Sequence, residues 1–334
     1  MPHAAATRQL PPPRRLTAET LCRLSEAEHT AGPVAGGPID ANAYFLCPSL
    51  TPLWYTPSYA RLEEEDRRFY NQLTGLMNIE AIGWFESTFL PALSAAAARL
   101  PQDKDGWDLS RAIERFAADE REHIQWWEQL HAQSCAAIGL PRDTRLLRIK
   151  PLGQRVMSAL ARRGRWVSAV FWIMLALEEH SLEIARRNMG PVATQIDHTH
   201  LQAHRDHLRD ETRHVQLDWH LIDRFYATQT TPMRHMNARL FSAVLERFLL
   251  PPVRGAVQVL DWWVANRPHL AERRDTMKRE LAGVGEDPEY RAMMYSRRTT
   301  PVLFALLNRH PEMRALAQRL EGQSSSVLER AVPA

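Results

Sequence analysis

The sequence predicts an all-α protein whose core is a four-helix bundle. Apolar residues recur every three or four positions through four long segments, which is the spacing that places them on one face of a helix. Strand-type alternation of useful length does not occur. Two of the long segments also carry the same acidic and histidine motif, a pattern typical of four helices that enclose metal ions.

The composition is that of a folded domain rather than of a membrane or nucleic-acid-binding protein. The chain has 334 residues, of which 45% are hydrophobic and 24% charged, enough to bury a sizeable core. Its net charge of +3 is too balanced to indicate nucleic acid as a partner. The most apolar run, Trp166–Leu177, is far shorter than the roughly 20 residues that span a bilayer. The three cysteines lack metal-ligand spacing and the N-terminus lacks a signal-peptide pattern, so we expect a cytoplasmic protein.

Proline and glycine divide the chain into three parts. In residues 1–60 they interrupt every candidate element, so we expect an irregular N-terminal arm. Residues 61–230 hold the long periodic segments and are expected to form the bundle. Residues 231–334 are helical in pattern but repeatedly cut by proline, which predicts additional C-terminal helices packed on the bundle.

The first pair of bundle helices is expected between Ala60 and Gly139. The segment Ala60–Leu100 is periodic enough for one or two helices. The next segment ends at Gly139 and offers an aspartate or serine cap just before Arg111, at Asp108 or Ser110.

The second pair follows a basic linker. Residues 141–165 contain eight basic side chains and one acid, which indicates either a solvated connection or a docking site for an acidic partner such as a carrier protein. Trp166–Asn188 and Val192–Thr230 then form the next two predicted helices.

The two pairs contain an internal repeat. Residues 119–123 and 210–214 both read Asp-Glu-x-x-His. Glu86 lies upstream of the first copy with 32 residues between it and the aspartate, and Glu179 lies upstream of the second with 30 between. Each pair therefore offers one glutamate from its first helix and a Glu-x-x-His from its second, which is the ligand set of a bundle that holds two iron or manganese ions.

Charge and ligand type support this interpretation over a chance match on a solvated face. A glutamate and a histidine three residues apart project from the same side of a helix. Four glutamates balance the charge of two divalent cations, so a buried site would be close to neutral. Oxygen and imidazole ligands suit iron or manganese, whereas the absence of cysteine disfavours iron–sulfur clusters and structural zinc.

The sequence leaves a choice between two adjacent glutamates, Glu178 and Glu179, for one of the ligands. Glu178 has apolar neighbours of its own, but we favour Glu179 because Ala176, one turn behind it, leaves room. Asp119 and Asp210 are expected to contact histidines of neighbouring helices, as metal-bound imidazoles usually require.

With these motifs the chain resembles the diiron N-oxygenase family of aureothin-type p-aminobenzoate N-oxygenases and chloramphenicol-pathway arylamine oxygenases, over about Pro52 to Tyr226. The resemblance implies a ferritin-like bundle whose site uses four glutamates and three histidines, one of them four residues before the last glutamate. The segment between Glu179 and His207 looks slightly longer than in the family's best-known member, which keeps Glu178 open. The metal ligands that the resemblance implies are Glu86, Glu120, His123, Glu179, His207, Glu211 and His214.

The resemblance also implies an activity. It is that of a non-haem diiron monooxygenase, which uses two Fe ions (Fe²⁺/Fe³⁺) and O₂ to convert a primary amine to a hydroxylamine, and onward to nitroso or nitro, in natural-product biosynthesis. The expected partners are a small-molecule or carrier-tethered amine and an electron donor protein or other reductant, with a homodimer as the candidate assembly. No catalytic group beyond the metal ligands is expected. Oxidation or desaturation at carbon, and a ferroxidase or iron-binding role, stay open as alternatives.

Overall fold

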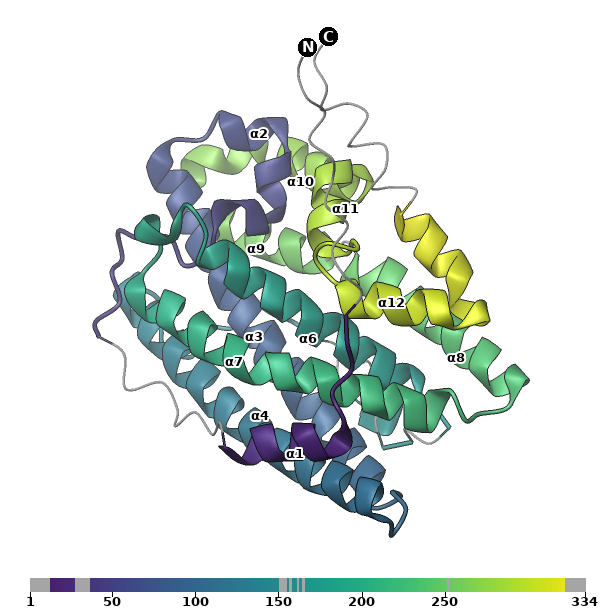
Figure 1. Ribbon diagram of the computed structural model, residues 1–334. Coiled ribbons are helices and arrows are strands. Elements are labelled where there is room, and N and C mark those ends of the chain that lie inside the picture. Colours follow the sequence, from purple (N-terminus) through teal and green to yellow (C-terminus); the bar gives the residue numbers. More distant parts are fainter. Residues whose placement is uncertain are drawn as a thin grey trace, which may run out of the picture.

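The computed structural model describes residues 13–27, 37–149, 155, 158–160, 162–163, 166–250 and 253–321. Within these residues the regular structure is helical and contains no strand, although an isolated bridge joins Tyr44 and Ile196. The predicted all-α class is confirmed (Figure 1).

Four long helices form the bundle at the centre of the molecule. They are α3 (Glu64–Ala97), α4 (Lys104–Ala137), α6 (Ala169–Asn188) and α7 (His198–Leu221). Helix α3 packs on α4 and α6 packs on α7, while contacts of α4 with α7 and of α3 with α6 close the bundle (Figure 1). This arrangement is the ferritin-like bundle that the sequence predicts.

Shorter elements cover the bundle and connect its helices. The α-helices are α1 (Ala18–Ala27), α2 (Pro57–Ala60), α8 (Thr231–Val244), α9 (Val253–Asn266), α10 (Arg274–Gly283), α11 (Pro288–Met294) and α12 (Pro301–Arg309). The 3-10 helices are η1 (Pro48–Leu50), η2 (Pro52–Tyr55), η3 (Ala193–Gln195), η6 (Pro268–Arg273), η7 (Val284–Glu286) and η8 (Pro311–Met313), and the π-helices are η4 (Ile222–Tyr226) and η5 (Leu245–Leu249). Helix α1 lies on α4 and α7, α8 on α6, α9 on α3, and α12 on α6 and α7.

Helix α4 begins earlier than predicted. The Asp103 side chain accepts a hydrogen bond of 2.7 Å from the backbone N–H of Gly106 and caps the helix. A Cβ on Gly106 would lie 2.1 Å from the carbonyl oxygen of Pro101, so the tight approach of the preceding turn requires glycine. The predicted cap at Asp108 or Ser110 is therefore wrong, since both residues lie inside the helix.

Helix α7 is shorter than the predicted segment Val192–Thr230. Asp197 caps it by accepting a 2.9 Å hydrogen bond from the backbone N–H of His200, after the separate turn η3. At the other end α7 passes directly into the π-helix η4. Helix α6 likewise begins at Ala169 rather than at Trp166.

The N-terminal arm contains more helix than its glycines and prolines predict. Helix α1 buries Leu21 and Cys22 against the bundle, so tertiary packing stabilises a short amphipathic segment that would be marginal alone. Part of the basic linker, at residues 150–154, 156–157, 161 and 164–165, lies outside the described residues.

One hydrophobic core joins the bundle to the C-terminal helices. Leu73 of α3, Trp172 of α6, Trp263 of α9 and Leu303 of α12 are all fully buried in the same cluster. The outer helices therefore complete the apolar surroundings of the bundle.

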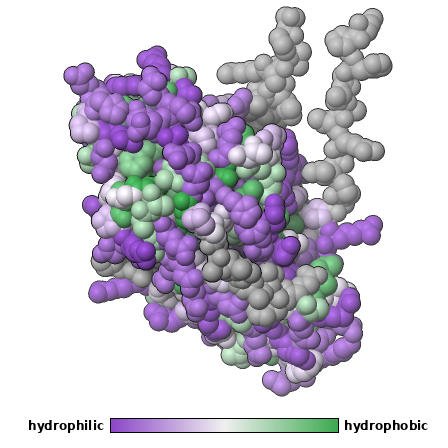
Figure 2. Space-filling view, turned by 90° about the vertical axis from the view of Figure 1, so that its left-hand side faces the viewer, coloured by the Kyte–Doolittle hydropathy of each residue, from purple (hydrophilic) through white to green (hydrophobic). Residues whose placement is uncertain are grey.

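The surface is mostly hydrophilic on the face in Figure 2, with apolar residues gathered in its upper half. In the part of the chain that the structure describes, no helix combines the length and apolar character needed to cross a membrane.

Candidate metal centre

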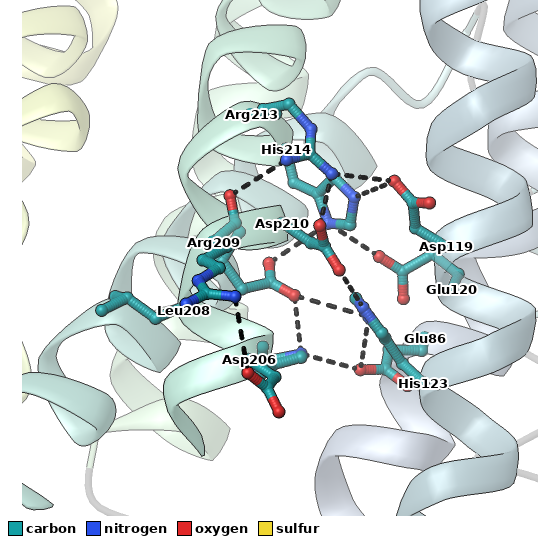
Figure 3. A network of polar contacts seen from close by, with 12 residues as sticks. Glu86, Asp119, Glu120, His123, Asp206, Leu208, Arg209, Asp210, Arg213 and His214 are labelled. Carbon is teal, nitrogen blue, oxygen red and sulfur yellow. Dashed lines mark hydrogen bonds and ion pairs between the residues drawn. The ribbon is translucent and has the colours of Figure 1, made fainter. Parts of the chain in front are cut away.

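The candidate centre lies inside the bundle, on facing sides of α3, α4, α6 and α7. The structure brings six of the seven predicted ligands together, each at most 5% exposed: Glu86, Glu120, His123, His207, Glu211 and His214. Figure 3 labels Glu86, Glu120, His123 and His214 among them. Their side chains form two adjacent groups that share one residue, Glu211.

The first group consists of Glu86, His123, His207 and Glu211, whose donor atoms all lie within 4.8 Å of one another. His207 Nε2 lies 2.6 Å from Oε1 of Glu211 and 3.3 Å from Oε1 of Glu86. His123 Nδ1 lies 3.7 Å from Oε1 of Glu211 and 3.8 Å from Oε1 of Glu86. Three separate helices thus direct two carboxylates and two imidazoles at one point.

The second group consists of Glu120, Glu178, Glu211 and His214, again within 4.8 Å of one another. His214 Nδ1 lies 3.0 Å from Oε1 of Glu120 and 3.3 Å from Oε2 of Glu211. The two oxygens of Glu211 therefore face different groups, which is the geometry expected of a bridging carboxylate.

Glu179, the glutamate favoured from the sequence, points elsewhere. Its oxygens accept hydrogen bonds of 2.7 and 2.8 Å from the backbone N–H groups of Val302 and Leu303, at the start of α12. Adjacent helical residues differ by about 100° in direction, so when Glu178 faces α7 its neighbour must face away. The structure therefore brings Glu178, the alternative that the sequence left open, into the second group and leaves Glu179 outside it.

The donor set fits two cations of the iron or manganese type. Among the described residues, several buried atoms of these side chains have no hydrogen-bond partner, including Oε2 of Glu86, Oε2 of Glu120 and Nδ1 of His123. Buried polar atoms are rarely left unpaired, and a metal ion would satisfy them. Donor atoms within 4.8 Å of one another can surround an ion at the roughly 2.0–2.2 Å that such ligands prefer.

Two aspartates cross the bundle to hold the histidines. Asp210 of α7 lies 3.1 Å from Nε2 of His123 on α4, and Asp119 of α4 lies 3.6 Å from Nε2 of His214 on α7 (Figure 3). Arg213 contacts both aspartates. With a proton on each Nε2, the lone pair of each Nδ1 faces the centre, as metal binding requires.

Aromatic side chains complete the walls of the centre. The Trp127 Nε1–H donates a 3.2 Å hydrogen bond to Oε1 of Glu86. The Phe116 ring stacks on His214 with a centroid distance of 3.8 Å and an interplanar angle of 22°. Both aromatic residues are about 2% exposed, so they exclude water from two sides.

Protonation of His207 and His214 compensates the clustered carboxylates. Burial would lower the pKa of His207, but Glu211 and Glu86 raise it to about 10. Burial raises the pKa of Glu211, but His207 outweighs it and holds that pKa well below its usual value. Burial and the charge of Glu86 raise the pKa of Glu120 to about 8, and burial with Glu211 raises that of Glu178. Cations that bind here would replace these protons, so binding should release protons to solvent.

Asp218 is a buried acid near the centre that the sequence analysis did not select. It is 0% exposed, and neither carboxylate oxygen has a hydrogen-bond partner in the described part of the chain. Its position four residues after His214 and seven after Glu211 continues the same helix face, so extending that row would have found it.

Comparison with known proteins gives one family match. A family model described as P-aminobenzoate N-oxygenase AurF matches residues 12–295, a range that includes all four bundle helices and both groups of donor residues. No curated protein matches the chain.

Proposed function

We propose, from the premise that this chain belongs to the AurF p-aminobenzoate N-oxygenase family, that it is a diiron oxygenase acting on the amine nitrogen of an arylamine. The observation that carries the proposal is the pair of buried carboxylate and imidazole groups joined through Glu211. A ferritin-like bundle places such a pair at its centre when it holds two iron ions.

The proposed ligands follow the two groups. Glu86, His123, His207 and Glu211 would hold one iron ion, and Glu120, Glu178, Glu211 and His214 the other. Glu178 takes the place of Glu179 in this set. The four glutamates offset the charge of two ferrous ions, which lowers the cost of burying them.

The surrounding residues would orient the ligands and keep the centre dry. Asp210 would accept a hydrogen bond from Nε2–H of His123, and Asp119, 3.6 Å from Nε2 of His214, favours a proton on that nitrogen as well. The hydrogen bond from Trp127 Nε1–H likewise restrains the orientation of the Glu86 carboxylate. Iron bound here would supply the redox chemistry that activates dioxygen, with the protein contributing orientation and electrostatics.

The proposed reaction balances as a monooxygenation. One oxygen atom enters an N–H bond of the primary amine to give a hydroxylamine, and the other leaves as water. An external reductant supplies two electrons, and two protons come from solvent. Further oxidation at the same nitrogen would give the nitroso and nitro products, and the proposed setting is a natural-product pathway.

The test combines iron analysis with product analysis. The apo-protein is titrated anaerobically with Fe²⁺, and the loaded protein then receives isotopically labelled dioxygen, a chemical reductant and p-aminobenzoate as the probe amine. We expect two iron ions per chain and label on the amine nitrogen, measured by metal analysis and mass spectrometry. Label on carbon instead would reassign the reaction, and a chain that takes up no iron would refute the proposal.

Substitutions connect this activity to the proposed ligands. Glu178→Gln and His214→Ala should each remove iron from one group, because a neutral amide or a methyl group replaces a ligand. Glu183→Gln is the matched control, since Glu183 is a buried glutamate of the same helix whose carboxylate pairs with Arg187 instead. Iron content that is equal in all three variants would refute the ligand assignment.

A further inference from the structure

Two adjacent glutamates of α6 are both buried, yet they engage different parts of the molecule. Glu178 is 8% exposed and belongs to the second donor group, whereas Glu179 is 1% exposed and contacts α12. Burying a carboxylate is costly without strong donors, so each of the two must be compensated where it points.

The compensation of Glu179 comes from the first turn of α12. The opening N–H groups of a helix have no partner within it, and the Thr300 cap residue of α12 makes no side-chain capping bond. Glu179 supplies the missing acceptors, with one oxygen on Val302 N at 2.7 Å and the other on Leu303 N at 2.8 Å. The positive end of the helix dipole favours a carboxylate at this place.

Helix α12 is itself held firmly against the bundle. It packs on both α6 and α7, and its residues Leu303, Phe304, Leu306 and Leu307 are at most 1% exposed (Figure 1). A two-point contact between this helix and Glu179 therefore restrains both the rotation and the axial position of α6 at the residue next to Glu178.

The other half of the centre has a different restraint. Glu86 receives the Trp127 Nε1–H directly on its carboxylate. For Glu178 the restraint acts through the backbone of the following residue. It also comes from outside the matched part of the chain, because α12 begins after residue 295, where the family match ends.

We propose that Glu179 is a positioning residue: by capping α12 it fixes the turn of α6 that presents Glu178 to the metal centre. This inference rests on the proposed function, since it requires Glu178 to be a ligand. According to this inference, α12 in the C-terminal part of the chain helps to set the position of Glu178 at the centre.

The first test is the variant Glu179→Gln. Its amide oxygen can still accept from one backbone N–H, but its NH₂ group would face the other, so one of the two bonds is lost. We expect the affinity for Fe²⁺ in anaerobic competition with a chelator to fall about tenfold at one of two sites, the usual scale for residues behind a ligand. Backbone amides of residues 302 and 303 should exchange faster in hydrogen exchange measured by mass spectrometry.

Glu183→Gln is again the matched control, because it neutralises a buried carboxylate of α6 one turn further on. It should leave both Fe²⁺ affinity and exchange in α12 unchanged. If Glu179→Gln accelerates exchange in α12 while binding Fe²⁺ as tightly as Glu183→Gln, Glu179 is only a helix cap and the inference is overturned.

A second test uses the unaltered chain and does not depend on a variant that folds. Coupling between two sites is reciprocal, so if the cap on α12 favours metal binding, metal binding must favour the cap. Saturation with Fe²⁺ should slow exchange of the amides at residues 302 and 303 several-fold. If iron binds but exchange at residues 302 and 303 does not change, the inference about Glu179 is overturned and the proposed function is not. If the chain binds no iron, both are overturned.

Discussion

At the scale of single residues, the centre concentrates groups that are costly to bury. Carboxylates of four helices meet within one dry region, and imidazolium charges on α7 offset part of their repulsion. Asp218 stands apart from this compensation, since both of its oxygens lack a partner among the described residues. A buried acid without a hydrogen-bond partner lowers the free energy of unfolding, and such local destabilisation is common close to functional sites.

The destabilisation of the fold by the buried Asp218 carboxylate depends on pH. Burial raises its pKa well above the ordinary value, with Glu211 and Glu120 acting in the same direction and His214 against it. A carboxyl whose folded-state pKa is raised contributes stability below its unfolded-state pKa, and this contribution is lost as pH rises toward the folded-state value. The apo-protein should therefore lose stability from this group as pH rises above about 4.

Asp218→Asn should abolish this loss at nearly constant side-chain volume. We expect the variant to exceed the parent in free energy of unfolding by about 1–3 kcal/mol at pH 8, with a smaller gap at pH 5. Urea unfolding of the metal-free proteins at both pH values measures the gap. Glu128→Gln, on the exposed side of α4, is the control and should show no such gap. A gap for Asp218→Asn that does not grow with pH would contradict the assigned cause.

At the scale of elements, α3 shows how a helix can hold an otherwise irregular arm. The Asn71 side chain accepts hydrogen bonds from the backbone N–H groups of Phe45 and Leu46 and donates one to the carbonyl of Leu46. These bonds draw the arm so close that a Cβ on Gly75 would lie 2.8 Å from the Cβ of Phe45. The glycine is thus required by the close approach of the arm.

Two glycines of α3 provide a matched pair of variants. Gly75→Ala should lower the free energy of unfolding by about 1–3 kcal/mol, because the added methyl group overpacks a fully buried contact. Gly83→Ala should raise it by about 0.5–1 kcal/mol, because nothing lies within 4 Å of that position and alanine favours the helix. Denaturant unfolding measures both. Effects of the same sign would show that helix propensity, rather than packing against Phe45, decides the outcome.

At the scale of the whole molecule, the bundle and the outer helices share one core. Trp263 of α9 contacts Tyr70 of α3 with a ring centroid distance of 5.1 Å, and the leucines of α12 lie in the same cluster as Trp172. The proline pattern suggests a division at residue 230. The helices become shorter there, but the packing of the core continues across it. We propose that the four bundle helices and the helices α8 to α12 fold as one unit.

This proposal predicts a single cooperative unfolding transition. Circular dichroism and tryptophan fluorescence should give coincident thermal curves for the apo-protein, because tryptophans of the bundle and of α9 report on the same core. Bound Fe²⁺ should shift both curves upward together, since it binds the folded chain. Two separated transitions, with only one sensitive to iron, would contradict it.

The family and most of the centre could be predicted from the sequence. The match to the AurF family confirms the resemblance carried by the two Asp-Glu-x-x-His copies. Spacing along one helix is a local property, so it correctly placed His207, Glu211 and His214 in one row. The cap of α4 was missed because several polar residues before Arg111 could serve, and only the carbonyl of Pro101 against Gly106 selects Asp103.

By itself, then, the sequence determined the helical class, the repeated ligand motif and six of the seven side chains that meet at the centre. Tertiary structure alone placed Glu178 rather than Glu179 at the centre, selected which histidine each of Asp119 and Asp210 contacts, and brought α12 against α6. The physical reason is that helical periodicity fixes angles within one helix, whereas the rotation of each helix about its own axis depends on what packs against it.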